Sequence, residues 1–336
     1  MKKYLVTGGA GFIGSDFVRR MLAKHDDWEV VCFDKLTYAG NLDNLKAVAD
    51  DPRYSFVRGD ICDRAAVEAA ARGVDAIVNF AAETHVDRSI AEPEAFLHTD
   101  ILGTHTLLET VRALGIERMV QVSTDEVYGS IEEGAFCETD LIKPSSPYSA
   151  SKAGGDLQVL AYHTTYGTPV MITRGSNTYG PYQYPEKLIP LFVTNALEGG
   201  QLPLYGDGMN VRDWLHVDDH CDGIEFVLLH GEPGEVYNVG GGNERTNREI
   251  TSIIIDELGL TDDVIKRVAD RPGHDRRYAL DCGKLAAMGW TPQVEFDRGL
   301  RDTIRWYRDN PWWWTKIKHQ TEEFADWRKR WYEERT

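Results

Sequence analysis

The chain has 336 residues, which exceeds the usual size of one domain and favours about two domains. With 42% hydrophobic and 27% charged residues, it has the composition of a globular protein, which excludes a wholly disordered or fibrous chain. Lys and Arg number 37 against 54 Asp and Glu, and the net charge of −17 argues against nucleic acid or an anionic membrane as a general partner.

The N-terminus and the cysteines indicate a cytoplasmic protein. The first apolar run, 4–7, is too short for a signal peptide, and no run of 18 apolar residues could span a membrane. The five cysteines are scattered, odd in number and without C-x-x-C spacing, so we expect free thiols in a reducing compartment.

Short apolar runs alternate with helical patterns over the first 180 residues. Strands are predicted at 4–7, 30–33, 55–57, 76–80, 119–122 and 170–173. Helices are predicted between most of them, at 12–23, 64–71, 102–114 and 150–166. Nearly all-apolar strands separated by helices are typical of a parallel sheet covered on both faces. The predicted fold class is therefore α/β, with a doubly wound, Rossmann-type sheet.

Prolines and paired glycines interrupt this pattern beyond residue 180. We expect 1–180 to form a dinucleotide-binding domain and 181–336 a smaller mixed lobe that binds the substrate, with 211–230 packing back on the first domain. The tail 299–336 holds six of the nine tryptophans. We expect helices there that dock an aromatic face on the body, in preference to a site for single-stranded nucleic acid.

A glycine-rich turn follows the first predicted strand, with Gly8, Gly11 and Gly14 in G-x-x-G-x-x-G spacing. Such glycines allow a tight turn, close approach of backbone N–H groups to a pyrophosphate, and close packing of helix on sheet. Asp34 ends the second strand, where an acid can hold both ribose hydroxyls and repel a 2′-phosphate, so NAD is favoured over NADP. Further cofactor contacts are expected from Phe12, Ile13, Lys35, Thr37, Asp60, Ile61, Ala81, Ala82, Thr99 and Ser123.

Tyr148 and Lys152 stand four residues apart at a predicted helix start and share one helix face. The ammonium should favour the tyrosinate and lower the pKa of the phenol, so that Tyr148 acts as a base, while Lys152 can also bind ribose hydroxyls. Thr124, at the end of the fifth strand, could hydrogen-bond the same substrate oxygen.

Asp125 and Glu126 follow that strand end directly. Hydride transfer alone needs no such pair. Two acids fit the cleavage of a carbon–oxygen bond, in which one protonates a leaving hydroxyl and the other takes a proton from carbon. The alternative is a solvated acidic turn.

Together, the glycine turn, Thr124, Tyr148 and Lys152 resemble the extended short-chain dehydrogenase/reductase superfamily over 1–180. Longer strings resemble the dTDP-glucose 4,6-dehydratase family over almost the whole chain, at 79–89, 146–154, 179–190, 205–220 and 271–275. The chain departs from that pattern at Thr84 (usually Ser), Thr178 (usually Asn) and Asp16 (usually His or Asn).

The resemblance implies loss of water from dTDP-glucose to give dTDP-4-keto-6-deoxyglucose, with tightly bound NAD oxidising C4 transiently. It implies that Tyr148 deprotonates the 4-hydroxyl, Glu126 removes H5 and Asp125 protonates the departing 6-hydroxyl. Thr178 is then placed near the nicotinamide. The implied substrate contacts are Thr84, Thr124, Asn177, Lys187, Leu188, Pro203, Tyr205, Arg212, Asn247, Arg271 and His274. A homodimer joined through 102–114 and 150–166 is also implied.

Several alternatives stay open. The histidines of His216-Val217-Asp218-Asp219-His220 lack the Glu of H-E-x-x-H and a third ligand, so we expect structural histidines and no metal. The chain could instead be a dehydratase acting on GDP-mannose or a UDP-sugar, a nucleotide-sugar 4-epimerase or decarboxylase, or a non-catalytic NAD-binding regulator.

Overall fold

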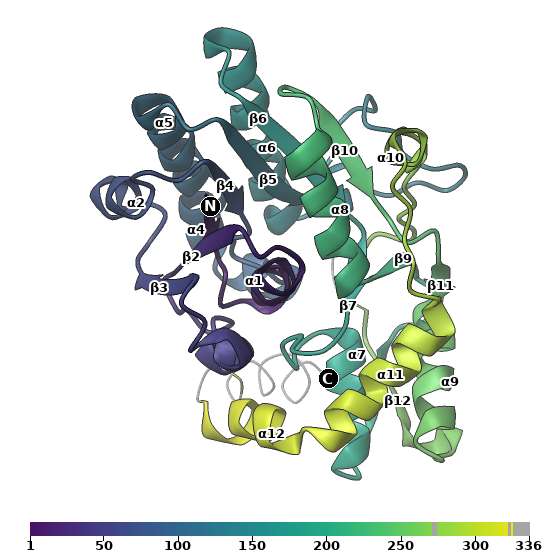
Figure 1. Cartoon of the computed structure of the whole chain (residues 1–336). Helices are drawn as coiled ribbons and strands as arrows, with labels where there is room; N and C mark the ends of the chain where they lie inside the picture. The colour runs from purple at the N-terminus through teal and green to yellow at the C-terminus, as the bar shows by residue number, and fades with distance from the viewer. Residues whose placement is uncertain (271–273, 322–323, 325–336) are drawn as a thin grey trace.

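The computed structural model describes residues 1–270, 274–321 and 324 (Figure 1). Seven parallel strands form its main sheet, which confirms the predicted doubly wound α/β fold. In spatial order they are β10 (Val236–Val239), β6 (Val170–Gly175), β5 (Arg118–Thr124), β4 (Ala76–Asn79), β1 (Lys2–Thr7), β2 (Trp28–Asp34) and β3 (Tyr54–Arg58). All six strands predicted from the sequence are present, and β10 was missed.

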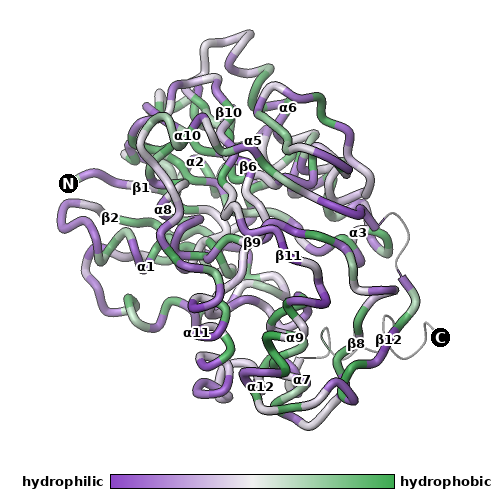
Figure 2. Tube along the Cα trace, turned by 90° about the vertical axis from the view of Figure 1, so that its right-hand side faces the viewer, coloured by the Kyte–Doolittle hydropathy of each residue, from purple (hydrophilic) through white to green (hydrophobic). Residues whose placement is uncertain are grey.

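Helices cover both faces of this sheet, because successive strand residues point to opposite sides. Tyr4 and Val6 of β1 join one apolar cluster, whereas Leu5 between them joins the other. The first cluster includes α1 (Phe12–Lys24) and α8 (Val217–His230), and the second includes α2 (Arg64–Ala70), α5 (Thr104–Leu114) and α6 (Pro147–Tyr166). Apolar stretches gather in the interior accordingly (Figure 2).

Two predicted helices differ at their N-terminal ends. The expected helix 102–114 starts as a π-helical segment, Leu97–Gly103, which follows α3 (Val86–Ala91) and α4 (Pro93–Phe96) and continues into α5. The helix expected at 150–166 begins at Pro147, because Ser146 and Ser149 form a reciprocal capping box. That early start places Tyr148 in the first helical turn.

The rest of the chain builds a second, smaller part around an aromatic and aliphatic cluster. Its sheets are β11 (Glu244–Thr246), β9 (Val211–His216) and β7 (Asn177–Tyr179), and the pair β12 (Ile265–Val268) and β8 (Leu202–Tyr205). Its helices are α7 (Leu188–Leu197), α9 (Asn247–Glu257), α11 (Phe296–Asp309) and α12 (Pro311–Gln320). Three 3-10 turns, η1 (Leu42–Val48), η3 (Asp125–Val127) and η4 (Asp262–Val264), complete the described elements together with α10 (Gly283–Met288).

Segments beyond residue 180 also complete the main sheet. Helix α8 packs on α1 and on β5 and β6, whereas residues 211–216 form β9 in the smaller sheet. The unpredicted β10 pairs with β6, and α10 packs on β10. The sheet is therefore not complete within the first 180 residues.

The aromatic tail docks on the body as expected, as far as the structure describes it. Trp313 and Trp314 of α12 are buried in the second cluster, and Trp306 of α11 packs against it. Trp327 and Trp331 lie outside the described residues.

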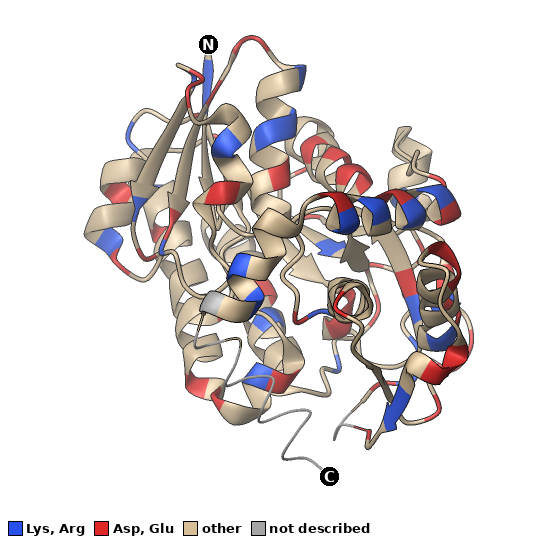
Figure 3. Cartoon of the chain, turned by 90° about the horizontal axis from the view of Figure 1, so that it is seen from below, with Lys and Arg blue, Asp and Glu red and all other residues tan. Residues whose placement is uncertain are grey.

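Charged residues of both signs are interspersed over the outer helices, as along α11 (Figure 3). The five cysteines are free thiols. In the part of the chain that the structure describes, no helix is long and apolar enough to cross a membrane, and no three His, Cys, Asp or Glu side chains cluster as metal ligands.

Candidate active site

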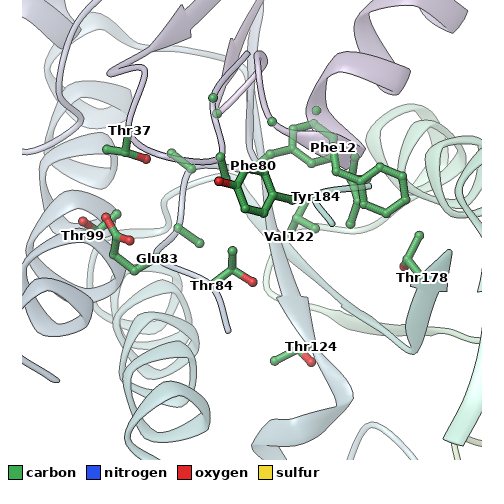
Figure 4. A pocket seen from close by; sticks show the side chains of 18 of the residues that line it. Phe12, Thr37, Phe80, Glu83, Thr84, Thr99, Val122, Thr124, Thr178 and Tyr184 are labelled. Carbon is green, nitrogen blue, oxygen red and sulfur yellow. The ribbon is translucent and has the colours of Figure 1, made fainter. Parts of the chain in front are cut away.

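A cavity of about 310 Å³ lies at the carboxyl ends of the main-sheet strands, between the sheet and the second part. Every residue predicted to contact a cofactor lies on its wall: Gly8, Gly11, Phe12, Ile13, Gly14, Asp34, Lys35, Thr37, Asp60, Ile61, Ala81, Ala82, Thr99, Ser123, Tyr148, Lys152 and Thr178. Thr37, Glu83 and Thr99 mark one end and Thr178 the opposite end (Figure 4).

The glycine turn leaves no room for side chains. Gly8 has φ +67°, and a Cβ there would lie 2.5 Å from the Ala81 nitrogen. A Cβ on Gly14 would lie 2.4 Å from the Gly8 oxygen. This bare backbone at the start of α1 leaves a cradle that fits a dinucleotide pyrophosphate.

The Asp34 carboxylate is hydrogen-bonded to the same turn. Its Oδ2 accepts a hydrogen bond from the Ala10 N–H at 2.9 Å, and its Oδ1 accepts one from the Leu36 N–H at 2.7 Å. Burial raises the pKa of this carboxyl, and the two N–H donors oppose that effect. Each oxygen keeps a further lone pair, so ribose hydroxyls can still be held there.

The end of the cavity marked by Thr37, Glu83 and Thr99 carries acidic side chains. Lys35 forms an ion pair with Asp60 at 2.7 Å, which offsets one charge. Burial and the neighbouring Asp100 raise the pKa of Glu83 to about 7. Sequence reasoning missed Glu83, although it follows Ala81 and Ala82 directly.

The phenol and ammonium project into the cavity from α6. The Lys152 Nζ donates to the Val122 carbonyl at 2.9 Å, and Thr124 lines the cavity beside Tyr148. The expected lowering of the Tyr148 pKa is wrong for this structure. Burial, followed by the charges of Glu126 and Asp100, raises the pKa of the phenol well above its ordinary value, and the Thr124 contact opposes this only in part.

Asp125 is buried, which excludes the alternative of a solvated acidic turn. The Thr124 hydroxyl donates to its Oδ1 at 3.2 Å, and its Oδ2 has no hydrogen-bond partner among the described residues. Burial, then the charges of Glu126 and Asp213, raise the pKa of Asp125 well above its ordinary value. Burial therefore favours the protonated form of this side chain, which is the form able to donate a proton.

A second cavity of about 140 Å³ adjoins the first and shares part of its wall. The shared residues are Glu126, Tyr148, Asn177, Glu186 and Lys187. Most of the implied substrate contacts line this cavity: Asn177, Lys187, Leu188, Pro203, Tyr205, Arg212, Asn247 and His274. Thr84 and Thr124 line the first cavity, and Arg271 lies outside the described residues.

The second cavity carries basic groups for an anion. The Arg212 guanidinium is buried, donates from Nη2 to the Asp275 carbonyl at 2.9 Å and stacks 4.3 Å above the Tyr278 ring. The Lys187 Nζ donates to the Thr84 hydroxyl at 3.2 Å. Beside it, buried Glu186 forms an ion pair with Arg88 at 2.9 Å.

The departures from the family pattern have different consequences. Thr178 lies in the cavity wall, and its hydroxyl is hydrogen-bonded to the His220 Nδ1 at 2.7 Å. Burial lowers the pKa of His220 to about 4, so the ring is neutral. Asp16 pairs with Arg19 at 2.8 Å on α1 and does not line either cavity.

Glu83, Glu186, His220 and Trp313 line the cavities but were not predicted as site residues. Glu186 lies within the family-like string 179–190, and His220 is the second histidine of the segment 216–220. No local pattern marks Trp313, which reaches the first cavity from the C-terminal helix.

Comparison with known proteins agrees with this geometry. The sequence model for GDP-mannose 4,6 dehydratase matches residues 5–303. A dTDP-glucose 4,6-dehydratase from Streptomyces antibioticus is 54% identical over 320 residues, covering 94% of this chain and 95% of the relative.

Among solved structures, the dTDP-glucose 4,6-dehydratase of Streptomyces venezuelae, crystallised with NAD and TYD, is 57% identical with a TM-score of 0.92, and the match covers 94% of this chain and 100% of that one. The UDP-glucose 4-epimerase of Thermus thermophilus, crystallised with NAD, is 34% identical with a TM-score of 0.85 and covers 92% and 99% of the two chains. This chain therefore belongs to the GDP-mannose 4,6-dehydratase family.

Proposed function

We propose that the chain is an NAD-dependent hydro-lyase that converts dTDP-glucose to dTDP-4-keto-6-deoxyglucose and water. One observation carries the proposal. A phenol and two carboxyl groups, Tyr148, Asp125 and Glu126, meet beside a dinucleotide-shaped cavity, and Tyr148 and Glu126 also line the smaller cavity next to it.

The first cavity would hold NAD. The Gly8–Gly14 turn would receive the pyrophosphate, Asp34 the adenosine ribose, and Lys152 the ribose at the nicotinamide end. Bound NAD⁺ supplies a hydride acceptor at the sugar C4 and later a hydride donor at C6. The cofactor ends each turnover as it began, so it has no need to leave.

The chain's own groups would move the protons. Tyr148 takes the proton of the sugar 4-hydroxyl as the phenolate, a form that the chain alone disfavours and that the positive nicotinamide of bound NAD⁺ would favour, and Thr124 beside it steadies that oxygen. A C4 ketone acidifies the C5 proton, which Glu126 removes and gives back to C5 when hydride reaches C6. Asp125, whose protonated form burial favours, gives its proton to the departing 6-hydroxyl, so water leaves without the expulsion of hydroxide.

The second cavity would hold the nucleotide. Arg212 offers a planar guanidinium to the pyrophosphate, and Lys187 offers an ammonium close to the reacting end of the cavity. Asn177 has a buried Oδ1 without a hydrogen-bond partner among the described residues, an acceptor that suits a hydroxyl of the sugar. On this assignment, 1–180 mainly holds the cofactor and 181–336 mainly the nucleotide sugar.

Product analysis tests the reaction directly. Purified protein is incubated separately with dTDP-glucose, UDP-glucose and GDP-mannose, and the masses of the products are measured by mass spectrometry. Loss of one water from the dTDP-sugar is expected. A product of unchanged mass would identify a 4-epimerase, as in the Thermus thermophilus relative, and dehydration of another nucleotide sugar alone would correct the substrate.

The Glu126→Gln variant tests whether Glu126 removes the C5 proton. We expect it to stop exchange of the C5 hydrogen with deuterium from the solvent and to lower product formation by about a thousandfold. Glu133→Gln, in the exposed loop that follows η3, is the matched control and should exchange normally. Normal exchange in Glu126→Gln would show that another group is the C5 base.

The assembly proposed with this function is a cytoplasmic homodimer. Leu97 and Leu102 of the π-helical segment and Leu157 and Tyr166 of α6 are large apolar side chains exposed on the outer side of the main sheet. A second copy of the chain would cover them. Light scattering is expected to give twice the chain mass for the native protein and the monomer mass for Leu102→Glu with Leu157→Glu.

A further inference from the structure

The C-terminal helix reaches across the chain to the glycine turn. Trp313 of α12 is 1% exposed and lines the first cavity. Its Nε1 donates a 2.8 Å hydrogen bond to the Oδ1 of Asn44, 269 positions earlier in the chain. Figure 1 shows α12 passing beneath the early segment that contains Asn44.

Asn44 is also hydrogen-bonded to the glycine turn. Its Nδ2 donates to the Ala10 carbonyl at 3.0 Å, and the Asn41 N–H donates to the same oxygen at 2.9 Å. The Ala10 N–H is already held by Asp34 on the other side. The backbone between Gly8 and Gly11 is thus fixed from both directions, and one of the two anchors ends at α12.

Further contacts hold α12 in that place. Lys316 forms an ion pair with Asp43 at 2.7 Å. The Tyr182 ring packs edge to face against Trp313, with 5.6 Å between the ring centroids. The Arg19 guanidinium lies 4.5 Å from the centroid of the Tyr182 ring, and its Nη1 donates to the Asn44 carbonyl at 2.5 Å. Tyr182 adopts φ +67°, a left-handed conformation that is unfavourable for a bulky residue and is held by this packing.

We infer that the hydrogen bond from Trp313 to Asn44 slows the dissociation of the dinucleotide from the first cavity, and we call this hydrogen bond the latch. The inference rests on the proposed function, in which the cofactor is regenerated in every turnover and gains nothing by leaving. Trp313 and Asn44 are then positioning residues: they act through the glycine turn and by closing the cavity corner formed by Ala39, Gly40 and Asn41.

The test measures how fast bound NAD leaves the full-length protein, using isotopically labelled NAD chased with excess unlabelled NAD. Trp313→Phe keeps an aromatic ring but leaves the buried Asn44 oxygen without its donor, so we expect dissociation about tenfold faster. The matched control is Trp312→Phe on the same helix. Trp312 is 46% exposed and, among the described residues, its Nε1 donates to Asn310 of its own turn, so NAD should leave at the native rate.

A second variant keeps the test sharp if Trp313→Phe folds poorly. Asn44→Ala should also speed NAD release about tenfold, and the double variant should release NAD no faster than either single variant, because both break one connection. KM for the nucleotide sugar should stay at the native value in all three proteins. A purely structural role would lower the melting temperature of protein with and without NAD equally and leave the release rate unchanged.

The outcomes separate the two proposals. If NAD binds and Trp313→Phe releases it at the native rate, the latch is overturned and the dehydratase stands. If the release rate rises as expected but no water is lost from any nucleotide sugar, the latch stands and the reaction is overturned. If the native protein binds no NAD, both are overturned.

Discussion

The two cavities are lined by different kinds of residues. The first includes backbone and small residues at the ends of one parallel sheet, with Gly8, Gly11, Ala81 and Ala82 on its surface. The second adds polar and charged side chains from separate segments that do not line the first, such as Arg212, Asn247 and His274. A surface of close-fitting backbone suits an occupant that stays, whereas charged side chains suit an anionic ligand that exchanges in every turnover.

Tyr148 belongs to both cavities, so its removal should have the largest effect. We expect Tyr148→Phe to lower kcat by about a thousandfold, because no other phenol on the shared wall can accept the proton of the sugar hydroxyl. The NAD content of the purified variant should stay native. Steady-state kinetics and quantification of bound NAD check this, with Tyr166→Phe at the exposed end of α6 as control. A variant with normal kcat would show that the two cavities do not meet in one reaction.

Arg212→Lys should affect the second cavity alone. Lys keeps the charge but loses the planar fork and the stacking on Tyr278, so KM for dTDP-glucose should rise about tenfold to a hundredfold with a smaller change in kcat. The control is Arg276→Lys, which alters an ion pair to Asp207 at the surface and should leave KM within twofold. Faster NAD release in Arg212→Lys would contradict the division between the cavities.

Glu83→Gln should have the smallest effect, and only on the first cavity. In the folded chain burial raises the pKa of Glu83 from 4.5 to about 7, so the folded state holds this proton more tightly than the unfolded state does. Its contribution to stability is full below about pH 4.5 and is lost as the pH rises through 7.

Urea unfolding of NAD-free protein at about pH 5 and about pH 8 measures this linkage. The free energy of unfolding of the native chain should fall relative to that of Glu83→Gln by about 1–3 kcal/mol between the two conditions. Glu94→Gln, at an exposed position on α4, should leave the pH dependence as in the native chain. Equal pH dependence of native chain and Glu83→Gln would contradict the assignment to Glu83.

The first cavity could be predicted from the sequence because its residues follow apolar strands, and parallel strands bring their carboxyl ends to one edge. Gly8, Asp34 and Thr124 were placed correctly by that rule alone. The second cavity was reached only through the resemblance to a family, since no local pattern relates Asn177, Arg212 and Asn247. Arg271 lies outside the described residues.

What could not be predicted depends on long-range packing. Trp313 carries no signal that it contacts Asn44, 269 positions earlier, and β10, four residues long, has no more periodicity than a loop. The pKa of Tyr148 was misjudged because the spacing to Lys152 was visible in the sequence, whereas burial beside Glu126 and Asp100 was not.

Strand β10 has a consequence for how the protein is made. Because β10 pairs with β6, a ribosome must synthesise the chain as far as Val239, and bring that segment clear of its exit tunnel, before the main sheet can close. Until then β6 presents an open edge to other nascent chains, and the face later covered by α8 is bare. A fragment that stops near residue 180 would keep both exposed surfaces permanently, so we expect it to aggregate on expression.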